Sequence, residues 1–198
     1  MRILLLLATV YFSASSIAVA SDESPSSPAV HFTIVGSMVD GFFDGPAELF
    51  TSGTIRRAAG LYRKGKPDGS WSFWDSGRSR IAVFTFREGV LEGQAKLYFG
   101  SFNTPAAAGK LKVGGTMKSG WWDGIIQSWY SDGSSRSERI YEAGKVVRAS
   151  ARDGDGASYS ESVAMERAQR DDASDRKLVT LLTAIIREAP DHAQRRTP

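Results

Sequence analysis

The fold is decided by the stretch GKPDGSWSFWDSG at residues 65–77. It contains two glycines four residues apart, then polar and aromatic residues that largely alternate, and then an Asp-Ser-Gly turn signal. Alternation with a period of two is typical of a β-strand. Glycine reaches positive φ at little cost and Asp bonds its own backbone, so this turn favours a tight reversal of the chain. The stretch therefore predicts a strand that runs into a hairpin turn.

Glycine pairs with the same spacing recur along the middle of the chain. Their first members, Gly41, Gly65, Gly89 and Gly120, lie 24, 24 and 31 residues apart, and another 24 residues lead to Gly144. An acidic residue precedes the second glycine of every pair: Asp44, Asp68, Glu92 and Asp123. An apolar residue lies three positions before every first glycine: Met38, Tyr62, Phe86, Met117 and Tyr141. A period of this length indicates a repeat array.

The array predicts an all-β fold, an antiparallel meander of repeated hairpins over residues 31–150. Turns are expected at residues 51–53, 75–77 and 131–133, and Trp71 and Trp129 are expected in equivalent surroundings. The 31-residue interval contains about seven extra residues at 100–109, which we place at a hairpin tip because a longer tip loop costs little. Since binding residues favour loops, this insertion is the first place to look for a unit-specific function, although a neutral surface insertion is the favoured explanation.

The repeat units resemble MORN repeats, and they look closest to a bacterial variant found in antitoxins of a toxin–antitoxin family. The segments that carry the resemblance are residues 65–77 and 120–133, and it extends over residues 38–147. Ala47 and Ala95 depart from the pattern where the second unit has Trp71. The resemblance implies an elongated sheet of hairpins that serves as a scaffold for protein contacts, and phospholipid binding has been proposed for some members. It carries over no catalytic residue.

Both ends of the chain differ from the array. Residues 1–20 combine Arg2, an apolar run and the small-residue site AVA at 18–20, which predicts a secretory signal peptide cleaved before Ser21. Residues 21–30 are rich in Ser and Pro and predict a flexible leader. The chain has no cysteine, so disulfides and thiolate metal sites are excluded. We expect export to a periplasm or to the outside, with no membrane span after cleavage.

Residues 157–189 predict a C-terminal amphipathic helical segment. Ser158 and Glu161 form a capping-box pattern, and Pro190 is expected to end the helix, with a break around residues 171–172. Apolar residues recur at helical spacing: Leu178, Leu181, Leu182, Ile185 and Ile186. We expect their face to pack on the sheet and cap the array. The alternative is a helix that docks on a partner or a membrane surface.

No constellation in the sequence predicts catalysis. The two histidines, His31 and His192, lie outside the repeats, in ends expected to be flexible, so we predict no catalytic residues, no metal site and no cofactor. The acids that precede the second glycines are interpreted as Asp-Gly turn chemistry. A pair of these carboxylates, such as Asp68 and Glu92, offers an alternative, in which the protein is an envelope hydrolase acting on polysaccharide.

Aromatic and apolar side chains are the remaining binding candidates. Apolar pairs separate or follow the glycines at residues 42–43, 90–91, 121–122 and 146–147, where they would form an apolar ridge along one edge of the sheet, unless one member of each pair is core. Strand aromatics alternate between the two faces, so some of them could stack carbohydrate or hold a peptide. The candidate binding residues are Phe42, Phe43, Trp121, Trp122, Trp74 and Trp129.

The sequence thus favours an exported, non-enzymatic interaction protein that contacts a protein or an envelope surface. The alternatives are the carboxylate-based hydrolase and a purely structural spacer. A formal net charge of +3 is too small an excess to indicate nucleic acid as a partner. An open meander has two free edges, so edge pairing between two copies would give a dimer.

Overall fold

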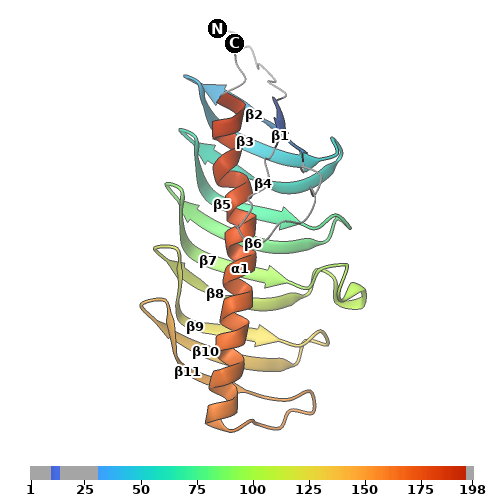
Figure 1. The fold of residues 1–198 in the computed structure, drawn as a ribbon, viewed down its shortest axis with the longest axis vertical. Coiled ribbons are helices and arrows are strands. Elements are labelled where there is room, and N and C mark those ends of the chain that lie inside the picture. Colours follow the sequence, from blue (N-terminus) through green and yellow to red (C-terminus); the bar gives the residue numbers. More distant parts are fainter. Residues whose placement is uncertain (1–9, 14–30, 195–198) are drawn as a thin grey trace, which may run out of the picture.

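The computed structural model describes residues 10–13 and 31–194, and it contains an antiparallel sheet followed by one long helix (Figure 1). Each strand pairs with its neighbours in sequence, so the strand order is the chain order. The strands are β1 (Val10–Ser13), β2 (His31–Val39), β3 (Phe42–Thr51), β4 (Ile55–Arg63), β5 (Lys66–Trp74), β6 (Arg80–Arg87), β7 (Val90–Tyr98), β8 (Leu111–Lys118), β9 (Trp121–Trp129), β10 (Ser135–Glu142) and β11 (Lys145–Ala151). A short 3₁₀ helix, η1 (Pro105–Ala107), precedes β8, and α1 (Glu161–Gln194) ends the described chain. The predicted all-β meander with a C-terminal helix is confirmed.

The first glycine of each pair lies in a two-residue hairpin turn. Lys64 and Gly65, for example, have φ angles of 49° and 77°, and the corresponding residues of the other pairs behave alike. Positive φ at both central residues defines the turn type whose twist matches that of paired strands. The opposite tips fall where the turns were predicted, and the insertion forms the tip between β7 and β8.

The second glycine of each pair lies inside a strand, which corrects the interpretation of these residues as turns. Gly69 has φ 69° within β5, where three residues of β5 face the single residue Gly60 of β4. Such a bulge increases the local bend and twist of the strand. The acidic residue and second glycine therefore belong to a bulged strand, and the strand begins directly after the first glycine.

One face of the sheet carries the hydrophobic core. Trp71, Phe73 and Phe84 are fully buried there, and they extend into a continuous cluster along the sheet. Trp71 lies across Gly60, where a Cβ atom would come within 2.2 Å of the indole ring. The expected equivalence of Trp71 and Trp129 is wrong: Trp71 lies two residues after its second glycine, whereas Trp129 lies five after, so the equivalent of Trp71 is Ile126, which is buried.

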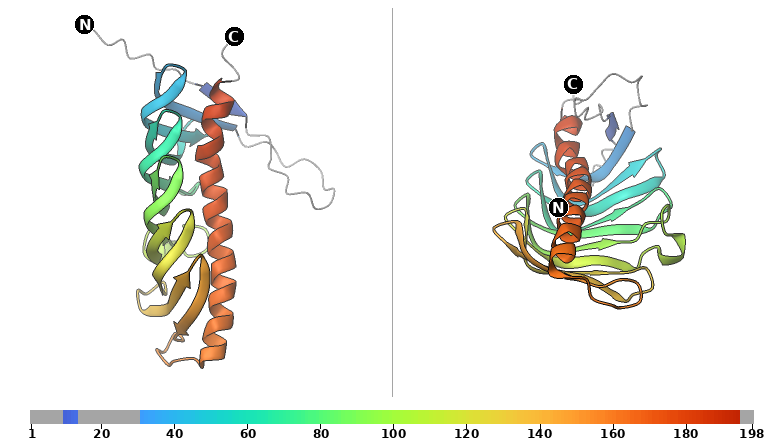
Figure 2. Two further views of the ribbon diagram at one scale, coloured as in Figure 1. Left: turned by 90° about the vertical axis from the view of Figure 1, so that its left-hand side faces the viewer. Right: turned by 60° about the horizontal axis from the view of Figure 1, so that its bottom comes forward.

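Helix α1 covers the core face along the length of the stack, crossing the strands (Figure 2). It starts beside β11 and ends beside β1 and β2. At about 1.5 Å per residue its 34 residues span roughly 50 Å, which matches about ten strand spacings of 4.8 Å. The expected packing of the helix on the sheet is confirmed, but the helix lies along the array instead of closing one end.

Two details of the predicted helix are wrong. The helix is continuous through residues 171–172, because these acids face partners on the sheet, and it continues past Pro190 to Gln194. Val179, Leu182 and Ile186 form its buried face, while Leu181 is exposed. Among the described residues, no helix combines the length and the apolar character needed to cross a bilayer.

The predicted signal peptide overlaps β1. Residues 10–13 pair with residues 31–34 of β2. The proposed cleavage site at residues 20–21 and the leader at 21–30 lie outside the described residues, so the signal peptide stays a prediction. The histidines that were expected in flexible ends lie within elements, His31 in β2 and His192 in α1.

Candidate functional site

The face of the sheet opposite α1 carries a row of aromatic side chains, here called the aromatic row. Its members are Phe50, Trp74, Tyr98 and Trp129. Each lies five residues after the second glycine of its unit, next to a buried residue such as Phe73, and each is half-buried. Because neighbouring side chains in a strand point to opposite faces, the row lies on the outer face. Trp129 lies over Gly114, whose missing side chain leaves room for the ring.

Arginine side chains stack on this row from the intervening strands. The guanidinium of Arg56 lies 4.1 Å from the ring centroid of Trp74, and that of Arg80 lies 4.8 Å from that of Tyr98. Leu111 takes the corresponding position beside Trp129, so the stacking changes from cationic to apolar in the last unit. A shallow hollow of about 330 Å³ lies at Phe50, Arg56 and Trp74.

The row is suited to an extended ligand. Its members come from every second strand, so they repeat at roughly 10 Å. Aromatic faces stack on flat apolar surfaces, and the arginines between them offer donors to carboxylate or hydroxyl oxygens. Arg56 also forms an ion pair with Glu48, with 2.9 Å between the two atoms, so the positive charge of Arg56 is partly compensated.

The predicted apolar ridge is divided between surface and core. Phe43 and Trp122 are buried and pack under the turns, so they present no binding surface. Phe42 and Trp121 remain 48% and 55% exposed. Trp121 is held in place by Arg176 of α1, whose guanidinium lies 4.9 Å from its ring centroid. The structure therefore separates the six candidate residues into a buried pair, an exposed ridge pair and two members of the aromatic row.

The recurring acids link one hairpin to the next. Glu92 accepts a hydrogen bond from the backbone N–H of Ser119 at 2.8 Å, and Asp68 accepts one from that of Glu88 at 3.3 Å. Asp68 also pairs with Arg63 at 3.0 Å. These carboxylates support the two-residue turns of the following unit, which is an inter-repeat role that the spacing alone did not reveal.

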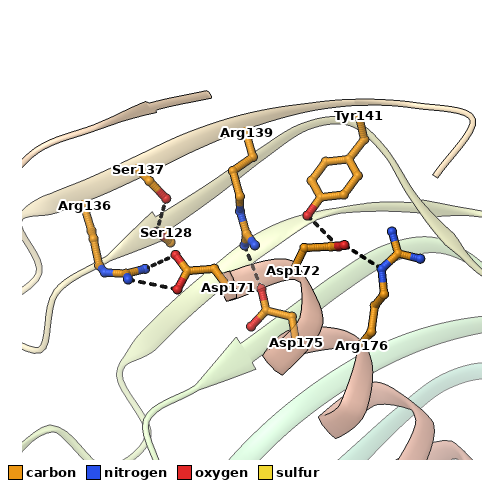
Figure 3. A network of polar contacts seen from close by, with 9 residues as sticks. All are labelled: Ser128, Arg136, Ser137, Arg139, Tyr141, Asp171, Asp172, Asp175 and Arg176. Atoms are coloured by element: carbon orange, nitrogen blue, oxygen red, sulfur yellow. Dashed lines mark hydrogen bonds and ion pairs between the residues drawn. The ribbon is translucent and has the colours of Figure 1, made fainter. Parts of the chain in front are cut away.

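A polar network fastens α1 to β10, near the end of the sheet (Figure 3). Arg136 makes two hydrogen bonds to Asp171, at 2.6 and 3.0 Å, and these bonds raise the pKa of Arg136. Burial raises the pKa of Tyr141, so its hydroxyl stays protonated and donates to Asp172 at 2.9 Å. Asp172 also accepts from Arg176, which donates to the carbonyl of Gly144 as well.

The insertion at residues 100–109 is tied to the neighbouring hairpin tip by Asp75. Its carboxylate accepts hydrogen bonds from the backbone N–H and the hydroxyl of Ser101, at 2.7 and 2.8 Å, and from the backbone N–H of Ser79 at 2.9 Å. Burial alone would raise the pKa of Asp75, but these hydrogen bonds together outweigh it and hold the pKa below its usual value. Asp75 therefore stabilises the fold in its ionised form.

Asp75→Asn is expected to lower the free energy of unfolding by about 2 kcal/mol at pH 7, because hydrogen bonds to a buried charge are lost. Since folding lowers the pKa, the stabilisation is complete above the unfolded-state pKa of about 4 and is lost as the pH falls through the folded-state value. Urea unfolding of the wild type and of Asp75→Asn at pH 7, 4 and 3 should show that the difference between their free energies of unfolding becomes smaller at low pH. Asp155→Asn, at an exposed position, serves as the control. A difference in the free energy of unfolding that does not change with pH would contradict the stabilising role of ionised Asp75.

Two kinds of site residue escaped sequence reasoning. Phe50 and Tyr98 were not selected, although their shared position in the repeat was a usable signal. Arg139 was also missed; it is fully buried in β10 at a position that is glycine in β2, β4 and β8. Within the described ranges, no group of three or more His, Cys, Asp or Glu residues gathers in a way that could hold a metal ion.

Comparison with known proteins does not assign the chain to a family: no family model matches it, and no curated protein matches it in sequence.

Proposed function

We propose that this protein is an exported, non-enzymatic binding protein, built on MORN-like repeats, that holds an extended protein or envelope polymer against the outer face of its sheet. The observation that supports the proposal is the aromatic row. The four side chains recur with the period of the repeat itself, so each unit contributes one equivalent contact.

The row is not needed to build the main core. Trp71, Phe73 and Phe84 already fill the face that α1 covers. On the outer face, half-exposed aromatic rings stacked by Arg56 and Arg80 are held rigid before any ligand arrives. Rigid, regularly spaced contacts favour a ligand that repeats along its length, since each added contact is then intramolecular.

The alternatives explain these features less well. A carboxylate-based hydrolase needs two carboxyl groups facing one substrate bond, whereas Asp68 and Glu92 accept hydrogen bonds from neighbouring turns. A structural spacer gives no reason for an outer row of aromatics in register with the repeat. The exported location rests on the signal pattern at residues 1–20.

The double variant Trp74→Ala/Tyr98→Ala is expected to weaken binding of the purified chain to envelope fractions of its host by about 100-fold, since each aromatic contact contributes on the order of 1–3 kcal/mol. Co-sedimentation with whole envelope, isolated cell-wall glycan and protein-depleted envelope would measure this and identify the ligand class. Phe102→Ala, which removes an exposed aromatic from the insertion loop, is the matched control.

The ridge variant Phe42→Ser/Trp121→Ser distinguishes binding by the exposed ridge pair from binding by the aromatic row. Unchanged binding by this variant supports the aromatic row as the contact surface. Loss of binding in the ridge variant alone would move the site to the ridge. If all three variants bind like the wild type, neither surface is the contact and the proposal fails. If the wild type does not bind at all, the spacer becomes the better interpretation.

A further inference from the structure

Arg139 occupies a position that the repeat otherwise gives to small or apolar residues. The equivalent residues in the earlier units are Gly36, Gly60, Phe84 and Gly115. Arg139 is 0% exposed, on the face of β10 that packs against α1. Because a guanidinium remains charged at any ordinary pH, burying one is costly unless its donors are satisfied.

The partners of Arg139 satisfy only part of its guanidinium. Nη2 donates to Oδ2 of Asp175 on α1 at 2.7 Å, as Figure 3 shows. Among the described residues, Nε and Nη1 have no hydrogen-bond partner, although both are buried. An unpaired buried donor costs free energy that an acceptor would recover. Nε and Nη1 lie on different edges of the guanidinium, so each is a separate charged donor for an oxygen of a carboxylate or a phosphate.

A cavity of about 330 Å³ lies beside this arginine, between the sheet and α1. Phe99 and Tyr130 contribute aromatic groups to its lining, and Thr104 contributes from the insertion loop. Its size falls at the lower end of the range for small-molecule sites. The insertion that distinguishes the third unit is therefore part of the wall of the cavity.

The charges of the cavity favour an anion. Lys112 and Arg136 line it together with Arg139, and both are extra residues at strand bulges, one in β8 and one in β10. Asp171 and Asp175 are the acids in the lining. Three cationic groups against two carboxylates leave one positive charge uncompensated. Asp171 already accepts two hydrogen bonds from Arg136, so Lys112 and the two unpaired donors of Arg139 remain for a ligand.

We propose that this cavity binds a small ligand through one oxyanion group, a carboxylate or a phosphate, which Arg139 and Lys112 hold while the aromatic walls enclose an apolar body. The cavity lies on the helix side of the sheet, and of the four members of the aromatic row Trp129 also contributes to its lining. A ligand in this cavity would contact the insertion loop, the sheet and α1 at the same time. Binding therefore stabilises the folded chain as well as filling the cavity.

Calorimetric titration of the purified full chain tests the proposal at constant ionic strength. The probes are sodium benzoate, inorganic phosphate, and neutral benzamide as the uncharged counterpart of benzoate. We expect saturable binding of benzoate, phosphate or both, a rise of the melting temperature with the same ligand, and at least tenfold weaker binding of benzamide. The relative affinities of benzoate and phosphate show which oxyanion the site prefers.

Two variants locate the binding. Lys112→Met is expected to weaken anion binding about tenfold, whereas Lys66→Met, which removes an exposed lysine on the opposite edge, should leave it unchanged. The double variant Arg139→Met/Asp175→Leu replaces the ion pair by apolar groups and should fold but bind no anion. The proposal is overturned if neither anion binds saturably, if benzamide binds as well as benzoate, or if both lysine variants lose affinity equally.

Discussion

Gly60→Ala is expected to lower the free energy of unfolding by about 3 kcal/mol, the upper part of the usual range for overpacking a core. The new Cβ atom would lie 2.2 Å from the ring of Trp71, and the ring is fully buried. Trp71 cannot move freely, because its indole N–H donates to the carbonyl of Leu61 at 2.9 Å. Either the strands separate or the ring loses this position. Urea unfolding followed by tryptophan fluorescence measures the loss.

The control for this prediction is Gly154→Ala. Gly154 has ordinary φ and no atom within 4 Å of the new Cβ, so the stability of this variant should stay close to that of the wild type. Combining Gly60→Ala with Trp71→Leu should restore part of the loss, because a smaller side chain leaves room for the methyl group. Equal stability of Gly60→Ala and Gly154→Ala would show that Trp71 does not pack over Gly60.

Asp175→Ala is expected to cost about 3–5 kcal/mol, because it leaves Arg139 charged, buried and without its ion-pair partner. The pair joins β10 to α1 across 36 residues of sequence, at 2.7 Å. Burial raises the pKa of Asp175, and the charge of Arg139 and its hydrogen bond oppose part of this shift. Thermal and urea unfolding at pH 7 give the loss directly.

Two further variants distinguish the loss of the ion pair from a general effect of substitutions in α1. Arg139→Met/Asp175→Leu should be close to wild-type stability, since apolar replacement of a buried pair is often neutral or favourable. Glu166→Ala on the exposed face of α1 should change little. If Asp175→Ala were as stable as Glu166→Ala, the ion pair would not hold the helix on the sheet, and the assignment of α1 to this face would be wrong.

The candidate surfaces could be predicted only partly from the sequence. Trp74 and Trp129 were selected as aromatics, but the outward direction of a strand residue depends on the bulges before it. The bulge at the second glycine places Trp71 in the core and Trp74 on the outer face. The pairs at 42–43 and 121–122 were selected as a unit, yet neighbouring strand residues point to opposite faces, so one member of each is core.

The hairpin repeat can be predicted from the sequence alone. Glycine pairs at a 24-residue period fix where the chain reverses, and that information is local, because a turn needs only its own few residues to reach positive φ. The sequence also determined that a helix follows the array. The position of that helix cannot be predicted in this way, because it depends on contacts such as Arg139–Asp175 between residues far apart in the chain. The same holds for the cavity beside Arg139, which exists only after the insertion loop, the sheet and α1 have packed together.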